Sequence, residues 1–177
     1  MKKILLGIFM LLCIVSCGSG PDKTVSKFID SVKAEKMKEA AKYAIDDSFE
    51  GNLDVKYNNK FQELLFKTLL KNLEYKIVKT EKQDNETTIV TVEVTNVDVE
   101  KIFLQVFKKM TQETFSGNGS HSMSVDDRFK EELEAKDKPK TKNLTKFVVK
   151  KTANGEKIVL TAENIDVLLG KLNTTLS

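Results

Sequence analysis

The 177-residue sequence contains no tryptophan, two prolines, two cysteines and one histidine. The scarcity of proline excludes an extended or disordered stalk, because such segments are typically rich in proline and poor in apolar residues. The sequence also lacks an apolar run of about 20 residues, the length that a helix needs to cross a bilayer. What remains is a chain of about one domain, long enough to bury a core.

The first residues have the order of a secretion signal. The positive start Met1-Lys2-Lys3 is followed by an apolar stretch from Ile4 to Ile14, which only Gly7 interrupts. The stretch ends in the polar run Ser16-Cys17-Gly18-Ser19-Gly20-Pro21 rather than in a stop-transfer flank. A positive start, a short apolar run and small residues at its end predict a signal peptide at residues 1–16.

The end of this segment, Ile14-Val15-Ser16-Cys17, resembles the lipobox of bacterial lipoproteins: an aliphatic residue, a variable one, a small one and then cysteine. The resemblance implies that Cys17 receives a diacylglyceryl group with fatty acyl chains such as palmitate, and that a peptidase cleaves between Ser16 and Cys17. Two or more acyl chains hold a protein at a membrane stably, whereas one holds it marginally. The alternative is an ordinary signal peptide that ends near a cysteine by chance.

Lipidation at this point has consequences for the rest of the chain. Cys13 leaves with the signal and the sulfur of Cys17 carries lipid, so no intramolecular disulfide is expected and the fold must rest on its core. Residues 17–22 form the lipidated cysteine and a tether, which at roughly 3.5 Å per residue reaches no more than about 18 Å. The domain is therefore expected close to the extracytoplasmic side of the cell membrane or the outer membrane. Gly18 is not the aspartate that retains lipoproteins at the inner membrane in some bacteria with two membranes, which favours the outer membrane there.

The charge of the chain excludes one class of partner. The formal charge of +3 includes Lys2 and Lys3 of the predicted signal, so the remainder is close to neutral. Charged residues make up 31% of the sequence, and both signs are well mixed, as on a soluble surface. A basic footprint for nucleic acid is not supported.

Apolar residues at helical spacing predict helices in five parts of the chain. The spacing predicts one bent helix or two short ones over residues 25–44, and further helices over 61–69, 99–110, 124–133 and 165–172. Asn58 or Asn59 and Asp98 are expected N-caps, and Ser124 with Asp127 resembles a capping box.

Alternating and β-branched residues predict strands at 73–79, 89–95, 144–152 and 157–160, with loops at 46–52 and 117–122. Gln83-Asp84-Asn85 is an expected turn, and Asn154-Gly155 is the preferred two-residue hairpin turn, in which both residues take positive φ. Together these elements predict an α+β fold with an antiparallel sheet and helices packed on one face. We expect a single domain at 23–177, with a helical insertion at 98–138 between the two hairpins.

Three parts of the chain carry a further resemblance: the helical stretch from Thr24 to Tyr43, the strand from Val90 to Asp98, and the ending from Asn164 to Gly170. They resemble small bacterial lipoproteins of uncharacterised-domain families, which have a cystatin-like α+β fold akin to nuclear transport factor 2. The resemblance implies a cone-shaped pocket between sheet and helices, and no settled activity. The chain departs from the pattern at Glu35-Lys36, where relatives often carry a Gly-Asp-type break. It departs again at 157–159, where they often carry a tryptophan.

No catalytic constellation stands out in the sequence. His121 lies in a loop with Ser120, Ser122 and Ser124, but the members of a Ser-His-Asp triad usually come together through the fold rather than from one loop. An exposed loop histidine is the favoured interpretation. Gly117-Asn118-Gly119 lacks the preceding strand and the following lysine of a phosphate loop.

Two acidic pairs and a run of lysines could bind ions, but each also has an ordinary structural explanation. Asp46-Asp47 and Asp126-Asp127 lack the alternating ligands of a calcium loop, so helix ends are expected there and no metal ligand is assigned. The C-terminal third is locally basic through Lys136, Lys138, Lys140, Lys142, Lys146, Lys150 and Lys151. Either an anionic partner, such as lipid headgroups or cell-wall polymer, or a solvated sheet face with lysines protecting an edge explains the run. Alternation with Phe147 and Val149 favours the solvated face.

Tyr43 and Tyr75 are the candidate oxyanion donors of an isomerase-like enzyme, but the sequence places no carboxylate beside them. The sequence therefore favours a lipid-anchored, non-enzymatic envelope protein without a cofactor, which binds a small apolar ligand or a partner protein. The alternative is a small isomerase-like enzyme, which requires an ionisable carboxylate of perturbed pKa inside its pocket.

Overall fold

The computed structural model describes residues 20–45, 57–116 and 123–176. The loops expected at 46–52 and 117–122 lie outside these ranges. Four strands form one antiparallel sheet in the order β1-β2-β3-β4: β1 (Glu74–Lys82), β2 (Thr87–Val97), β3 (Lys140–Thr152) and β4 (Gly155–Val159). The helices are α1 (Pro21–Lys33), α2 (Met37–Ala41), α3 (Lys60–Asn72), α4 (Val99–Phe115), α5 (Val125–Glu134), α6 (Ala162–Leu168) and α7 (Leu172–Leu176). The fold is α+β with an antiparallel sheet, which confirms the predicted class.

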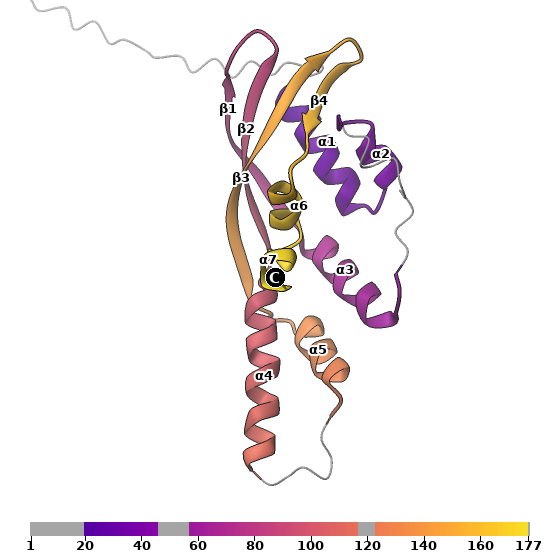
Figure 1. Cartoon of the computed structure of the whole chain (residues 1–177), viewed down its shortest axis with the longest axis vertical. Helices are drawn as coiled ribbons and strands as arrows, with labels where there is room; N and C mark the ends of the chain where they lie inside the picture. Colours follow the sequence, from indigo (N-terminus) through magenta and orange to yellow (C-terminus); the bar gives the residue numbers. More distant parts are fainter. Residues whose placement is uncertain (1–19, 46–56, 117–122, 177) are drawn as a thin grey trace, which may run out of the picture.

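One face of the sheet packs against helices and forms the first apolar core. Helix α1 contacts all four strands and α6 contacts β2 and β3, and Figure 1 shows α1, α2 and α3 on the same side of the sheet. Val90, Val92 and Val94 of β2 are buried in this core, and Phe147 of β3 meets Phe28 of α1 edge to face at 6.3 Å between ring centroids. Each such fully buried apolar side chain contributes about 1.5–3 kcal/mol relative to an exposed one.

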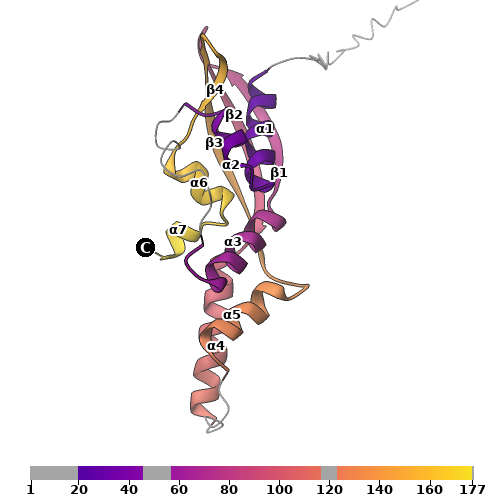
Figure 2. The same ribbon diagram turned by 90° about the vertical axis from the view of Figure 1, so that its right-hand side faces the viewer.

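A second apolar core holds the helices between β2 and β3 against the rest of the molecule. Helices α4 and α5 pack on each other, α5 packs on α3, and α4 contacts α7. Phe129 of α5 lies at its centre, with ring centroids 4.6 Å from Phe103 and 5.4 Å from Phe61. The free end of the α4–α5 pair extends beyond the sheet, at the end of the long axis opposite to the start of α1 (Figures 1 and 2).

The predicted caps of three helices are confirmed, one of them in part. The side chain of Asn59 accepts a hydrogen bond from the Gln62 N–H at 2.8 Å, and that of Asp98 accepts one from the Lys101 N–H at 3.0 Å. Ser124 accepts from the Asp127 N–H, but the Asp127 carboxylate accepts from the Ser124 hydroxyl at 2.6 Å. A capping box proper would engage the backbone N–H of the cap residue instead.

The two hairpins have the predicted positions, and one has a different turn. Asp84 closes the β1–β2 turn, because its side chain accepts from the backbone N–H groups of Glu86 and Thr87 at 2.8 and 2.7 Å. At the second hairpin the prediction of positive φ at both Asn154 and Gly155 was wrong, since only Gly155 has one (93°). Gly155 instead pairs with Thr152 as the first residue of β4. A glycine of positive φ following a turn fits the right-handed twist of the strands just as well.

The single helix predicted over 165–172 was wrong, because Gly170 and Lys171 take positive φ and separate α6 from α7. Three further predicted boundaries were also wrong. Leu73 is not the first strand residue but the C-cap of α3, where its buried side chain joins the first core. The second helix ends at Ala41 rather than reaching Ala44. Ala44 instead forms a parallel bridge with Ile158, on the side of β4 that does not pair with β3. Strand β4 ends at Val159, one residue before Leu160. In each case pairing or packing with a distant part of the chain decides the boundary.

Candidate functional site

An apolar pocket lies among the helices on the covered side of the sheet. Among the described residues it is lined by Val32, Met37, Tyr57, Phe66, Leu70, Ile165, Leu168 and Leu169, and its volume is about 160 Å³. The lining comes from α1, α2, α3, α6 and the residues that flank them, and no strand contributes. The pocket is therefore formed between helices, which differs from the pocket between sheet and helices that the family resemblance implies.

The walls of the pocket are held by the first core. Val32, Leu70 and Leu168 are buried side chains of that core, and the other lining residues are half-buried around them. The chain reverses between α1 and α2 in a tight turn, where the N–H of Lys36 donates to the carbonyl of Ser31 and Glu35 takes a positive φ of 58°. This turn brings Met37 back beside Val32, across from α3.

Among the described lining residues, Tyr57 carries a polar side-chain group. Its hydroxyl donates to a carboxylate oxygen of Glu35 at 3.4 Å, and its ring lies 6.2 Å from that of Phe66. Burial, with the Glu35 carboxylate as the next cause, raises the pKa of the Tyr57 hydroxyl. Glu35 itself is exposed, so the carboxylate lies outside the pocket and the interior stays apolar.

The two tyrosines singled out in the sequence lie elsewhere. The Tyr43 hydroxyl donates to Glu39 at 3.3 Å, while the Tyr75 hydroxyl donates to Asp30 at 3.0 Å. Burial is the main cause that raises the pKa of Tyr75. Each hydroxyl thus meets a carboxylate of a different helix, and neither side chain lines the pocket. The structure does not bring Tyr43 and Tyr75 together into one oxyanion site.

The structure places few of the other candidate residues. Ser16, Cys17, Asp46, Asp47, the glycine loop at 117–119, Ser120, His121 and Ser122 lie outside the described residues. Asp126 and Asp127 are exposed in the first turn of α5, where negative charge favours the helix dipole. In the described ranges, no three His, Cys, Asp or Glu side chains gather so that they could hold a metal ion. None of the described helices combines the length and the apolar character that a bilayer crossing demands.

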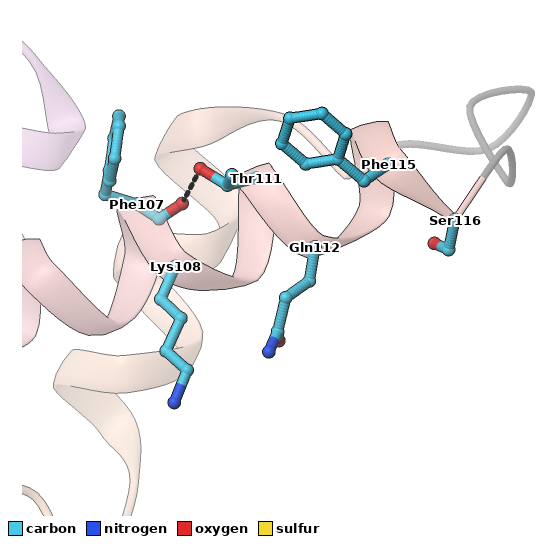
Figure 3. A pocket seen from close by; sticks show the side chains of 6 residues that line it. All are labelled: Phe107, Lys108, Thr111, Gln112, Phe115 and Ser116. Atoms are coloured by element: carbon cyan, nitrogen blue, oxygen red, sulfur yellow. Dashed lines mark hydrogen bonds between the residues drawn. The ribbon is translucent and has the colours of Figure 1, made fainter.

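Helix α4 carries a second apolar feature, on its solvent side. Phe107 and Phe115 are 70% and 85% exposed, and Leu104 near them is 59% exposed. Figure 3 shows Phe107 and Phe115 on either side of Thr111, above Lys108 and Gln112, along a hollow that also includes Ser116. Because every lining residue belongs to one helix and its C-cap, a group bound here is covered from one side only. The pocket between the helices, which is lined from several sides, is therefore the stronger candidate for a small ligand.

The lysine run of the C-terminal third follows the predicted alternation. Lys146 and Lys150 are exposed, whereas Phe147 and Val149 are buried against the helices. The lysines of β3 were predicted to protect a sheet edge. This holds only in part, because β3 pairs with β2 along its length and with β4 at its far end, so only the start of β3 has an unpaired side. Asn164 of α6, which follows β4 in the chain, is buried, and its side-chain amide donates to the backbone carbonyl of Lys146 at 3.0 Å.

Sequence reasoning missed the residues that form both apolar features. Tyr57 and Phe66 were not singled out, because the pocket depends on how four separate helices meet. The exposed phenylalanines of α4 did leave a signal: Leu104, Phe107 and Phe115 form a second apolar face beside the buried one, at spacings of three and eight residues. A helix with two apolar faces predicts that one of them remains uncovered.

The comparisons with known proteins add little to this picture. No family model and no curated protein matches the chain. One solved structure is similar, that of a "putative lipoprotein (ycdA)" from Bacillus subtilis subsp. subtilis str. 168, with 17% sequence identity and a TM-score of 0.39. The match covers 85% of this chain and 47% of that protein, so this chain spans about half the length of the neighbour. At this TM-score the likeness carries no argument about fold or function.

Proposed function

We propose that this protein is a lipid-anchored, non-enzymatic binding protein of a bacterial cell envelope, and that its helical pocket takes a small apolar group. The apolar surface that the described residues present to the pocket carries the proposal. A dry, apolar cavity of about 150 Å³ is large enough for a molecule the size of benzene. Pockets for drug-sized ligands are larger, at about 300–1,000 Å³. The occupant is therefore a single ring or branched aliphatic group, either free or as a side chain of a partner protein.

The chemistry of the lining supports binding over catalysis. An isomerase-like enzyme requires a general base and oxyanion donors that converge on the substrate inside an apolar pocket. Among the described lining residues, Tyr57 is the only one with a titratable group, and its partner Glu35 is exposed at the surface. A ligand held by this lining meets aliphatic and aromatic surface, and its affinity comes from removing apolar area from water.

Thermal unfolding with small probes tests the pocket. At ten times its dissociation constant, a benzene-sized probe that binds the folded state raises Tm by about 3–6 °C. Leu169→Phe fills the pocket from its wall and is expected to abolish the shift. Leu104→Phe, a matched change at an exposed position on α4, should keep it. Absence of any shift in the unaltered protein, with benzene, toluene and N-acetyl-leucine amide alike, contradicts the proposal.

The anchor is tested separately by fatty-acid labelling in a bacterial host. Cys17→Ala is expected to abolish labelling and to release the protein from the membrane fraction. Cys13→Ala is the matched control, since this cysteine lies inside the predicted signal and should leave labelling intact. A Cys17→Ala protein that still incorporates the labelled fatty acid excludes the proposed attachment site.

A further inference from the structure

The face of the sheet that points away from the helices is strongly cationic. The strand registers place seven lysines and three glutamates on it: Lys76, Lys79, Lys140, Lys142, Lys146, Lys150, Lys157, Glu74, Glu81 and Glu93. Removing Lys2 and Lys3 from the formal charge of +3 leaves +1 for the rest of the chain. The excess of four positive charges on this one face is therefore balanced by net negative charge elsewhere, so the molecule is polarised although it is nearly neutral.

The carboxylates of this face are already engaged. Glu74 pairs with Lys140 at 2.8 Å, Glu93 with Lys142 at 3.2 Å, and Glu81 with Lys79 at 2.8 Å. The structure gives Lys76, Lys146 and Lys150 no ion pair with any described residue, and all three side chains are exposed. The ammonium groups of Lys76 and Lys146 remain available to an external anion, and that of Lys150 also interacts with the Asp84 carboxylate, whose pKa it helps to lower.

Two rows of the sheet concentrate like charge. Lys150 lies directly opposite Lys157 in the β3–β4 register, and like charges in such cross-strand positions repel, although the Lys157 ammonium also donates to the backbone carbonyl of Lys42. Thr91 lies between Lys79 on β1 and Lys146 on β3, which brings two further lysines into one row.

Apolar side chains lie between these cationic rows. Ile89, Val148 and Val159 form one row across three strands, and each is half-buried. Leu144 is 61% exposed on the same face, next to Glu93 in the β2–β3 register. A surface with lysines around apolar side chains suits the boundary between phosphate headgroups and acyl chains, where both kinds of contact are made at once.

We propose that this cationic sheet face docks onto the anionic phospholipid headgroups of the membrane that carries the anchor. The geometry of the tether rests on the proposed lipidation of Cys17. Helix α1 starts beside the β3–β4 hairpin, where the Thr24 hydroxyl lies 3.5 Å from the Glu156 carboxylate. Because α1 begins at Pro21, the extended tether comprises residues 17–20 and reaches about 14 Å. This is slightly more than the diameter of a helix, about 10–12 Å. The domain then lies with its sheet on the membrane and its helices and pocket facing outward.

Vesicle co-sedimentation of residues 18–177, without the lipid, tests the face independently of the anchor, since all described helices and strands fall within this segment. Four net charges near an anionic surface give a half-saturating concentration of about 1 mM phosphatidylglycerol at low salt. Lys76→Gln, Lys146→Gln and Lys150→Gln in one variant are expected to raise it about 100-fold. Loss of binding at high salt is expected as well, because the contact is electrostatic.

A matched control removes the same charge from the helical side. Lys60→Gln, Lys71→Gln and Lys130→Gln change exposed lysines of α3 and α5, and this variant should bind as the unaltered protein does. Equal loss in both variants, or equal binding to neutral phosphatidylcholine vesicles, overturns the proposal. Binding to soluble polyphosphate without binding to anionic vesicles also overturns it, and assigns the face to an anionic polymer. Failure of either kind leaves the result of the Cys17 labelling experiment unaffected.

Discussion

Gly170 follows α6 and is required by the close approach of two backbone segments. It has a φ of 65°, in the left-handed region, and a Cβ added to it lies 2.3 Å from the backbone carbonyl oxygen of Val97 at the end of β2. The same Cβ lies 3.4 Å from a methyl group of Leu69. We therefore expect Gly170→Ala to be strongly destabilising, because a backbone oxygen cannot move aside as a flexible side chain does.

The magnitude follows from two additive costs. A left-handed conformation costs a non-glycine residue about 1–2 kcal/mol, and forcing an extra carbon into a packed site costs typically about 1–3 kcal/mol. Gly170→Ala should lower the free energy of unfolding by about 2–5 kcal/mol. Gly155→Ala is the control, because Gly155 also has positive φ, at 93°, but an added Cβ meets nothing within 4 Å. This variant should lose only about 1–2 kcal/mol.

Urea unfolding followed by circular dichroism measures both variants, and suits a chain without tryptophan. The difference between the two losses isolates the steric cost at Gly170 from the cost of the backbone conformation. Equal losses for Gly170→Ala and Gly155→Ala refute the argument, since they mean that the Val97 carbonyl yields freely to the added carbon.

Three further predictions concern single side chains. Because burial raises the pKa of Tyr75, its folded state holds the phenolic proton more tightly than the unfolded state. Stability should therefore fall as the pH rises above about 10, and Tyr75→Phe should reduce that fall in urea titrations at pH 9 and 10.5. Glu35→Gly should stabilise the α1–α2 turn by up to about 1 kcal/mol, since Glu35 has a positive φ of 58°, and a loss of stability in the same assay speaks against this. Phe107→Ser with Phe115→Ser should change the free energy of unfolding by less than about 0.5 kcal/mol, because both rings are exposed; a larger loss shows that they pack against the protein.

Local chemistry made much of the fold predictable. Asn59 and Asp98 stand directly before apolar stripes of helical period, and such residues satisfy the free N–H groups of the first turn. The β-branched alternation of residues 89–95 identified β2, and its valines are buried on one face as expected. In these elements, the information that decides the structure lies within a few residues of each position.

Boundaries set by distant partners were not predictable in this way. Leu73 continues the alternation of β1, yet it is buried by helix packing and ends α3. Ala44 has a helical context, yet Ile45 donates its N–H to the Ile158 carbonyl at 2.7 Å, and the chain leaves the helix to meet β4. The pocket was not predicted for the same reason, because its lining combines residues from α1, α2, α3 and α6, which meet only when the whole core is packed.

The position of α4 and α5 within the sheet bears on how the molecule assembles. Strand order follows chain order, so each strand pairs with its neighbour in sequence, and only the β2–β3 pairing spans a long separation. Val97 and Lys140, which close that register, are separated by about 40 residues, and closing a flexible loop of that length costs about 3 kcal/mol in chain entropy. Helices α4 and α5 fold back on each other and bring the two strand ends together. We therefore expect that a substitution that weakens the packing of α4 on α5 slows the joining of the two hairpins, because the chain between β2 and β3 then closes as a flexible loop.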